Sequence, residues 1–190
     1  MSPRFGRYDQ PTKLFLTHVC WFFMNSKTIL LWCREPSWCK GLSPAPFGDH
    51  VSLVPTYCFD PREFELFADN QSHQSYRCET LKGVEQLRQD LVARGSNLLV
   101  SNGHYEKVIP SIARVLQVDE VVTFLNTDPQ IGVFENLMSF RAESLSQVSF
   151  QLNMHSIGFR MLDLKDFKAY TAPALPPFPK INPGRIPSAA

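Results

Sequence analysis

Short apolar runs separated by polar turns fill the middle of the chain. The clearest run, VSLVPTYCF at residues 51–59, consists largely of β-branched and aromatic residues and stops at the polar segment DPRE. A run of this length bounded by turn residues is typical of a buried strand. Pro55 removes one backbone donor from it, which predicts an edge strand or an interruption there. Similar runs predict strands at residues 28–33, 97–101, 119–125 and 157–164.

Between these runs, apolar residues recur every three or four positions, as on one face of a helix. Residues 76–94 have such a face, and Gly95 provides a stop signal. The residues expected to point inward are Leu81, Val84, Leu87 and Leu91. A second helix is predicted after residue 104 and a third over residues 130–145, while the polar residues 68–75 predict a loop.

Strands that alternate with helices predict an α/β fold, here a single Rossmann-like domain with a parallel sheet and crossover helices. The connection after the first strand is the exception. It is rich in proline and glycine, so a full helix is not expected there. We therefore expect the crossover helix of this first connection to be degraded. We expect a poorly ordered N-terminal extension at 1–27, the α/β domain at 28–165 and a Pro-rich tail at 166–190.

The composition excludes several classes of protein. In 190 residues, 44% are hydrophobic, which is typical of a globular chain. Nineteen basic and eighteen acidic residues give a net charge of +1, so no global field attracts nucleic acid or anionic membranes. The apolar residues 14–24 lack a signal-peptide cleavage site and are too short to span a bilayer, so no membrane association is expected. Five cysteines without a C-x-x-C pair favour a reducing, intracellular compartment, with nucleus, cytoplasm and organelle undistinguished.

Several motifs in order resemble the photolyase and cryptochrome family. They are YCFDPREF ending the second strand, Leu87-Arg88 in the first helix, RGSNLLV, GHYEKVIP and VDEVV. The order is similar to that of the N-terminal α/β domain in the cryptochrome-DASH branch, and it covers residues 28–124. The chain departs from the family after Trp32-Cys33-Arg34, where the helix-opening residues of the first strand are replaced, and after Phe124.

The resemblance implies where a ligand would bind. Many family members hold an antenna chromophore, a folate (methenyltetrahydrofolate) or a deazaflavin, at the strand ends of this domain. The matching positions here, for a chromophore or a nucleotide, are Arg34, Phe59, Asp60, Pro61, Asn102 and Gly103. Phe59 could stack on a pterin and Asp60 could accept from its N–H groups. The alternative is that Phe59 belongs to the core and that Asp60 and Pro61 cap the following helix.

In the family, a C-terminal helical domain binds FAD and accepts the DNA lesion. FAD is not expected on this chain, and neither a catalytic residue nor a metal site is predicted. Trp21, Trp32 and Trp38 all precede the second strand, so no electron-relay chain can be drawn. We therefore expect a domain that is non-catalytic and does not bind DNA alone, and that docks a helical FAD domain or another protein through an exposed apolar face. The alternative is a fragment or separate half of a light-dependent DNA photolyase or cryptochrome, which would be deoxyribodipyrimidine photolyase-like once completed.

Overall fold

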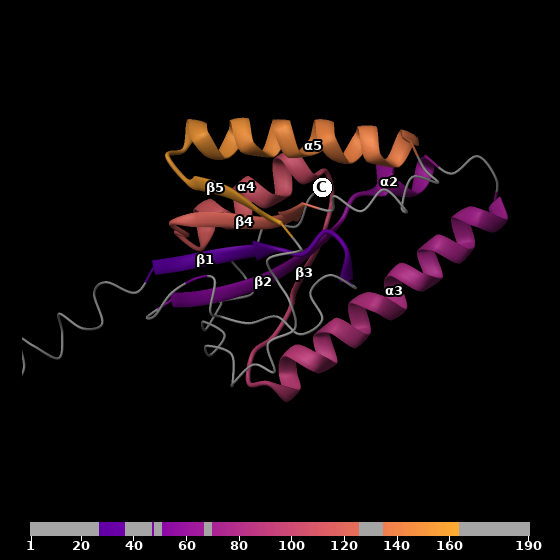
Figure 1. Ribbon diagram of the computed structural model, residues 1–190, viewed down its shortest axis with the longest axis horizontal. Helices are drawn as coiled ribbons and strands as arrows, with labels where there is room; N and C mark the ends of the chain where they lie inside the picture. Colours follow the sequence, from indigo (N-terminus) through magenta and orange to yellow (C-terminus); the bar gives the residue numbers. More distant parts are fainter. Residues whose placement is uncertain (1–26, 37–46, 48–50, 67–69, 126–134, 164–190) are drawn as a thin grey trace, which may run out of the picture.

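A five-stranded parallel sheet lies between two layers of helices in the computed structural model, which describes residues 27–36, 47, 51–66, 70–125 and 135–163 (Figure 1). In chain order the elements are β1 (Lys27–Trp32), β2 (Val51–Phe59), α2 (Pro61–Glu65), α3 (Asn70–Ala93), β3 (Leu99–Asn102), α4 (Tyr105–Val115), β4 (Glu120–Leu125), α5 (Glu135–Met154) and β5 (Gly158–Asp163). The strand order is β3-β2-β1-β4-β5, and every neighbouring pair is parallel. The predicted Rossmann-like α/β fold is confirmed.

The central strand β1 contributes to two hydrophobic cores because its side chains alternate between the faces of the sheet. Ile29 and Leu31 pack in the core beneath α3, together with Val84 and Leu87. Leu30 and Trp32 face the other way, into the core formed with α4 and α5. Burial on both faces explains why this strand is a continuous apolar run rather than an alternating one.

Pro55 lies within an interior strand, so the expectation of an edge strand or an interruption at this position is wrong. Thr56 accepts a hydrogen bond from the Cys33 backbone through its carbonyl, at 2.8 Å, so the backbone polar groups of Thr56 point toward β1. Those of Pro55 must then point toward β3, because successive residues of a parallel strand alternate. Pairing with β3 starts only at Thr56, opposite Leu99, so the missing donor falls where β2 has no neighbour on that side.

Helix α3 is longer than predicted. It starts at Asn70 instead of residue 76, so the loop predicted over 68–75 is wrong from residue 70 onward. Its 24 residues span about 36 Å, whereas the four residues of β3 span about 13 Å. The N-terminal half of α3 therefore extends beyond the carboxyl ends of the strands (Figure 1).

One predicted inward residue of α3 lies in this overhanging part. Val84, Leu87 and Leu91 are buried as predicted, but the side chain of Leu81 is 49% exposed. The helical periodicity is correct, and Leu81 is exposed because the sheet does not reach far enough to cover it. Gly83, between the two regions, allows close packing, since a Cβ there would lie 3.1 Å from the Cβ of Pro36.

Helix α5 extends nine residues beyond the predicted end at 145, to Met154. It returns the chain to β5, which confirms the last predicted strand. Most of the N-terminal extension, the Pro-rich tail and the degraded first connection fall outside the described residues. Within the described part, no helix combines the length and apolar character needed to cross a membrane.

Candidate functional site

The polar residues of the site gather where the parallel strands end. β2 ends at Phe59 and is followed directly by α2, while β3 ends beside it at Asn102 and is followed by α4. Phe59 and Asn102 are opposite one another in the register of these two strands. The carboxyl edge of an open α/β sheet is where such folds bind ligands.

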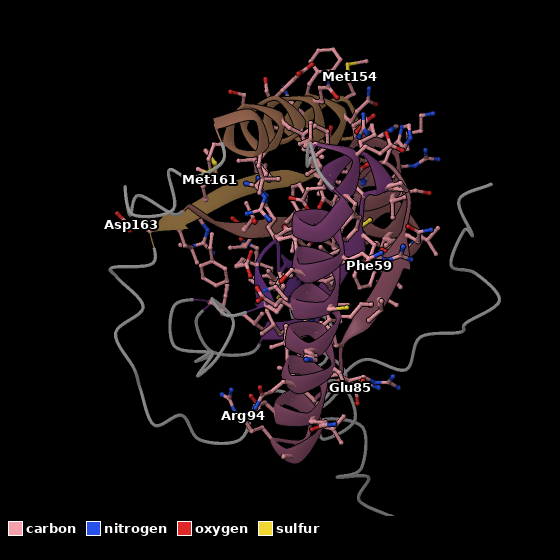
Figure 2. The ribbon with its side chains drawn as sticks, turned by 90° about the vertical axis from the view of Figure 1, so that its right-hand side faces the viewer. Phe59, Glu85, Arg94, Met154, Met161 and Asp163 are labelled. Atoms are coloured by element: carbon pink, nitrogen blue, oxygen red, sulfur yellow. The ribbon has the colours of Figure 1, made fainter. Side chains whose placement is uncertain are left out.

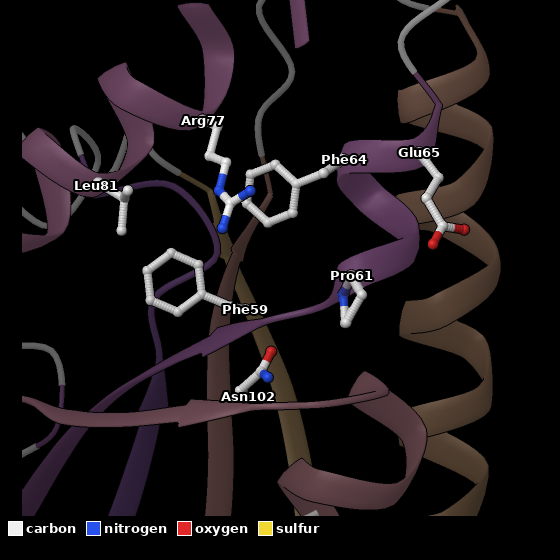
Figure 3. Close-up of a pocket in the computed structure, with 7 residues that line it drawn as sticks. All are labelled: Phe59, Pro61, Phe64, Glu65, Arg77, Leu81 and Asn102. Carbon is white, nitrogen blue, oxygen red and sulfur yellow. The ribbon is translucent and has the colours of Figure 1, made fainter. Parts of the chain in front are cut away.

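A hollow of about 450 Å³ opens at this edge, and we call it the Phe59 pocket (Figure 3). It is lined by Phe59, Pro61, Phe64, Glu65, Arg77, Leu81 and Asn102. These residues come from β2, α2, α3 and β3, so the pocket exists because the overhang of α3 leaves space above the strand ends. Its volume lies within the usual range for sites that bind a small organic molecule, about 300–1,000 Å³.

Aromatic rings form the floor and one wall of the Phe59 pocket. The rings of Phe59 and Phe64 are stacked, with centroids 6.3 Å apart and planes inclined by 28°. The rings of Tyr57 and Phe59 meet edge to face with centroids 4.8 Å apart, and those of Tyr76 and Phe64 have centroids 5.8 Å apart. Rings packed on their neighbours in this way are held in place before any ligand arrives, which lowers the entropic cost of binding.

Asp60 fixes the geometry of this wall. Its side chain is fully buried and caps α2 by accepting from the Arg62 backbone N–H at 3.1 Å, while Pro61 occupies the first helical turn. The same carboxylate accepts from the Arg62 guanidinium at 2.6 Å and from the backbone N–H of Tyr105 at 3.0 Å. One carboxylate thus holds the end of β2, the start of α2 and the start of α4 together.

Three of the six residues predicted as ligand contacts line the Phe59 pocket, and three do not. Phe59, Pro61 and Asn102 line the pocket. Asp60, Arg34 and Gly103 are not among the lining residues; the backbone N–H of Gly103 donates to the Phe59 carbonyl at 2.8 Å and keeps β3 against β2. The chemistry expected of Asp60, accepting from ligand N–H groups, is instead directed at the protein.

The remaining lining residues were not predicted from the sequence. They are Phe64, Glu65, Arg77 and Leu81. Phe64 follows the DPRE segment and could have been suspected there, and Arg77 and Leu81 are four residues apart on α3, as residues on one helical face are. That this face meets the strand ends depends on where α3 starts, which the polar segment before residue 76 did not reveal.

Beside the pocket lies a buried charged group that we call the Glu63 cluster, formed by Glu63, Arg141, Tyr76 and Tyr105. The Nε of Arg141 donates to Glu63, which also accepts from the Tyr105 hydroxyl at 2.9 Å. Arg141 donates to the Tyr76 hydroxyl at 2.9 Å. Burial, with the nearby Glu63 charge, raises the pKa of both tyrosines above the usual value, so both hydroxyls remain protonated at neutral pH.

Arg34 lies against this cluster. It is only 7% exposed, and burial together with the Arg141 charge lowers its pKa to about 10. Its guanidinium lies 5.4 Å from the centre of the Trp32 ring. Neither the Nε of Arg34 nor the Nε1 of Trp32 has an acceptor among the described residues. Two buried donors at the end of β1 therefore have no hydrogen-bond partner in the described part of the chain.

Two other residues of reactive type at this edge, Cys58 and His104, make contacts that belong to the fold. Burial raises the pKa of Cys58 to about 12, and its thiol lies 3.4 Å from the Gly103 carbonyl, so it is a protonated, packed side chain at neutral pH. His104 precedes α4, and its carbonyl accepts from the backbone N–H of Val108 at 2.9 Å. Within the described ranges no group of three or more His, Cys, Asp or Glu side chains could hold a metal ion.

Comparison with known proteins finds similarity to photolyases and cryptochromes. Residues 41–132 match the family model for DNA photolyase. Cryptochrome DASH of Gloeobacter violaceus is 34% identical over 102 residues, which cover 52% of this chain and 20% of that protein. Blue-light photoreceptor PHR2 of Arabidopsis thaliana is 38% identical over 73 residues, covering 37% of this chain and 16% of that protein. These matches span a fifth or less of the relatives' own length.

Solved structures of the same kind also align with the chain. The crystal structure of a Synechocystis cryptochrome aligns with a TM-score of 0.49 at 22% identity, covering 71% of this chain and 27% of the other. A class III photolyase from Agrobacterium tumefaciens aligns with a TM-score of 0.47 at 15% identity, covering 74% of this chain and 26% of the other.

Proposed function

Because the chain carries the N-terminal α/β domain of the photolyase/cryptochrome family, we propose that it binds a planar antenna chromophore in the Phe59 pocket and catalyses no reaction by itself. The supporting observation is the 450 Å³ hollow with stacked phenylalanine rings at the carboxyl edge of the sheet. A folate or deazaflavin ring would lie on these rings, and Asn102 would hydrogen-bond its polar edge. A nucleotide base is also a planar heteroaromatic ring and is the other ligand of this class.

An antenna needs no acid, base or nucleophile from the protein. The ligand supplies the absorption of light, and the protein supplies a dry, oriented binding surface. The residues around the pocket fit this role, since its walls are mainly apolar and its neighbouring carboxylates, Asp60 and Glu63, are already hydrogen-bonded within the protein. In this proposal FAD and DNA are bound by a separate helical domain. The free thiols of Cys33, Cys58 and Cys78 support a reducing, intracellular compartment for this function.

Substituting Phe59 by leucine tests the proposal, because leucine keeps the apolar bulk but removes the aromatic face. Thermal unfolding is followed with folic acid, a deazaflavin and FMN. At least one of them is expected to raise the melting temperature of the wild-type protein, since a ligand at about 100 times its Kd adds about 2.7 kcal/mol. The F59L substitution is expected to weaken that binding about tenfold, as loss of one aromatic contact costs up to about 1.5 kcal/mol.

Phe150 provides the matched control. It is 62% exposed on α5, away from the lining residues, so Phe150→Leu is expected to leave ligand affinity unchanged. The proposal fails if none of the three ligands stabilises the wild-type protein, or if F59L and F150L bind with equal affinity.

A second candidate function is docking of a helical flavin domain, or of another protein, on the carboxyl edge of the sheet. It is favoured by the two unpaired buried donors at Arg34 and Trp32. A buried N–H donor without an acceptor, such as the Nε of Arg34, costs free energy, and an acceptor supplied by a docked partner would recover that cost. In this proposal Arg34 contributes to the interface and not to the stability of the isolated domain.

The stability of Arg34→Met distinguishes these roles. Methionine retains the packing volume without the charge, so the free energy of unfolding is expected to change by less than about 1 kcal/mol or to rise. Urea denaturation measures it, with Arg62→Met as the comparison, because Arg62 is paired with both Asp60 and Glu106 and its loss should destabilise. A loss above about 2 kcal/mol in Arg34→Met would assign this residue to the fold and withdraw the docking proposal.

A further inference from the structure

The Phe59 pocket has one cationic side chain directed into it. Arg77 lies on α3 and is exposed, and its guanidinium points between Leu81, Phe59 and Phe64 (Figure 3). None of the ion pairs among the described residues involves Arg77. Glu65 also lines the pocket, but its carboxylate points away from these rings in the same view. Among the lining residues, Arg77 is therefore the charged side chain that faces the rings.

Three other arginines of the domain are paired with carboxylates. Arg62 pairs with Asp60 at 2.6 Å and with Glu106 at 2.7 Å. Arg141 is paired with Glu63, and Arg160 with Glu120 at 2.9 Å. The contrast matters because a guanidinium already engaged by carboxylates has fewer donors left for a ligand, whereas that of Arg77 keeps its planar set of N–H groups.

Resting on the proposed function of this pocket, we infer that its ligand is a planar heteroaromatic ring that carries an anionic group, and that Arg77 binds this group. The ring lies on Phe59 and Phe64, and Asn102 reaches its polar edge. Arg77 donates to a phosphate or carboxylate, for which its forked geometry suits two parallel hydrogen bonds. Neutral rings of the same shape then bind more weakly than their anionic counterparts.

Pairs of ligands that share a ring but differ in charge test this inference. FMN and riboflavin differ by one phosphate, and folic acid and biopterin compare a carboxylate-bearing pterin with a neutral one. Kd values come from fluorescence titration of the full chain. The anionic member of at least one pair is expected to bind about fivefold more tightly, the upper range for an exposed ion pair, and the pair that shows it identifies phosphate or carboxylate as the bound group.

Substitution of Arg77 completes the test. Arg77→Gln is expected to remove the difference between the members of that pair while leaving the affinity of the neutral member unchanged, and R77K should keep part of it. Arg88→Gln, an exposed arginine of the same helix outside the pocket lining, is the control and should behave as the wild type.

The outcomes separate this inference from the proposed function. If both members of each pair bind equally, or if R77Q weakens both members alike, the pocket binds rings without reading charge and the inference is wrong while the proposed function stands. If no ligand of either pair binds, the inference is wrong, and if the deazaflavin also fails to bind, the proposed function is wrong as well. Loss of the difference in R77Q but not in R88Q supports the inference.

Discussion

Replacing Glu63 by glutamine is expected to lower the free energy of unfolding by about 3–5 kcal/mol, the usual cost of removing one partner of a buried ion pair. Glu63 is 1% exposed, and Arg141, its partner, is 5% exposed. Without the carboxylate, Arg141 keeps Glu35 at 3.5 Å, which is partly exposed and farther away. The buried Arg34 also repels Arg141, and without the Glu63 carboxylate less negative charge offsets this repulsion.

Urea denaturation of E63Q and two further variants, each compared with the wild type, checks this expectation. Glu85→Gln on the exposed face of α3 is the control, and it should cost less than about 0.5 kcal/mol. The double variant Glu63→Leu with Arg141→Met removes both charges and should recover most of the loss, because an apolar pair replaces the ion pair. An effect of E63Q below about 1 kcal/mol would contradict the burial and pairing described for this cluster.

Replacing Asp60 by alanine is expected to cost about 3 kcal/mol. The substitution removes a helix cap, worth about 1 kcal/mol. It also removes the hydrogen bonds that the Asp60 carboxylate accepts from the Arg62 guanidinium and the Tyr105 backbone, and a hydrogen bond to a charged group is worth about 1.5–3 kcal/mol. It also leaves the Tyr105 backbone N–H, buried at the start of α4, without its acceptor. D60N should cost less, because an amide oxygen still accepts from backbone N–H groups.

Chemical denaturation followed by circular dichroism measures both variants of Asp60. Asp90→Ala, an exposed acidic residue on α3, is the matched control and should change stability by less than about 0.5 kcal/mol. If D60A were as stable as D90A, Asp60 would not hold the three elements together, and its role as a ligand contact would have to be considered again.

The centre of the sheet was predictable because β1, β2 and β4 are buried on both faces and therefore appear as continuous apolar runs between turns. The cap at Asp60 and Pro61 follows from local chemistry in the same way, and it was one of the two interpretations of that segment. Phe59 and Asn102 could be placed together because both end neighbouring parallel strands.

What could not be predicted depends on contacts between distant parts of the chain. The pairing of Glu63 with Arg141 joins residues 78 positions apart, and the sequence of neither segment indicates it. The exposure of Leu81 depends on how far α3 extends past the strands. In the second half of α5, every second residue from Val148 to Met154 is apolar, and this period of two does not indicate a helix, so the predicted helix ends at residue 145.

The side-chain view in Figure 2 shows how the edge at Phe59 relates to the rest of α3. Glu85 lies farther along the helix, away from Phe59, and beside it is a second, more open hollow lined by Leu81, Lys82, Glu85, Gln86 and Gln89. This hollow has no aromatic residue, and Gln89 donates to Glu85 across it at 3.0 Å. It therefore offers a ring no stacking surface.

Mapping a bound chromophore by amide chemical shifts tests the central claim most directly. The uniformly nitrogen-labelled protein is titrated with the ligand that gave the largest thermal shift. Saturable shifts are expected at Phe59, Phe64, Arg77 and Asn102, with Glu85 and Gln89 unchanged. Shifts confined to Glu85 and Gln89, or no saturable shift at the Phe59 pocket, would contradict the account.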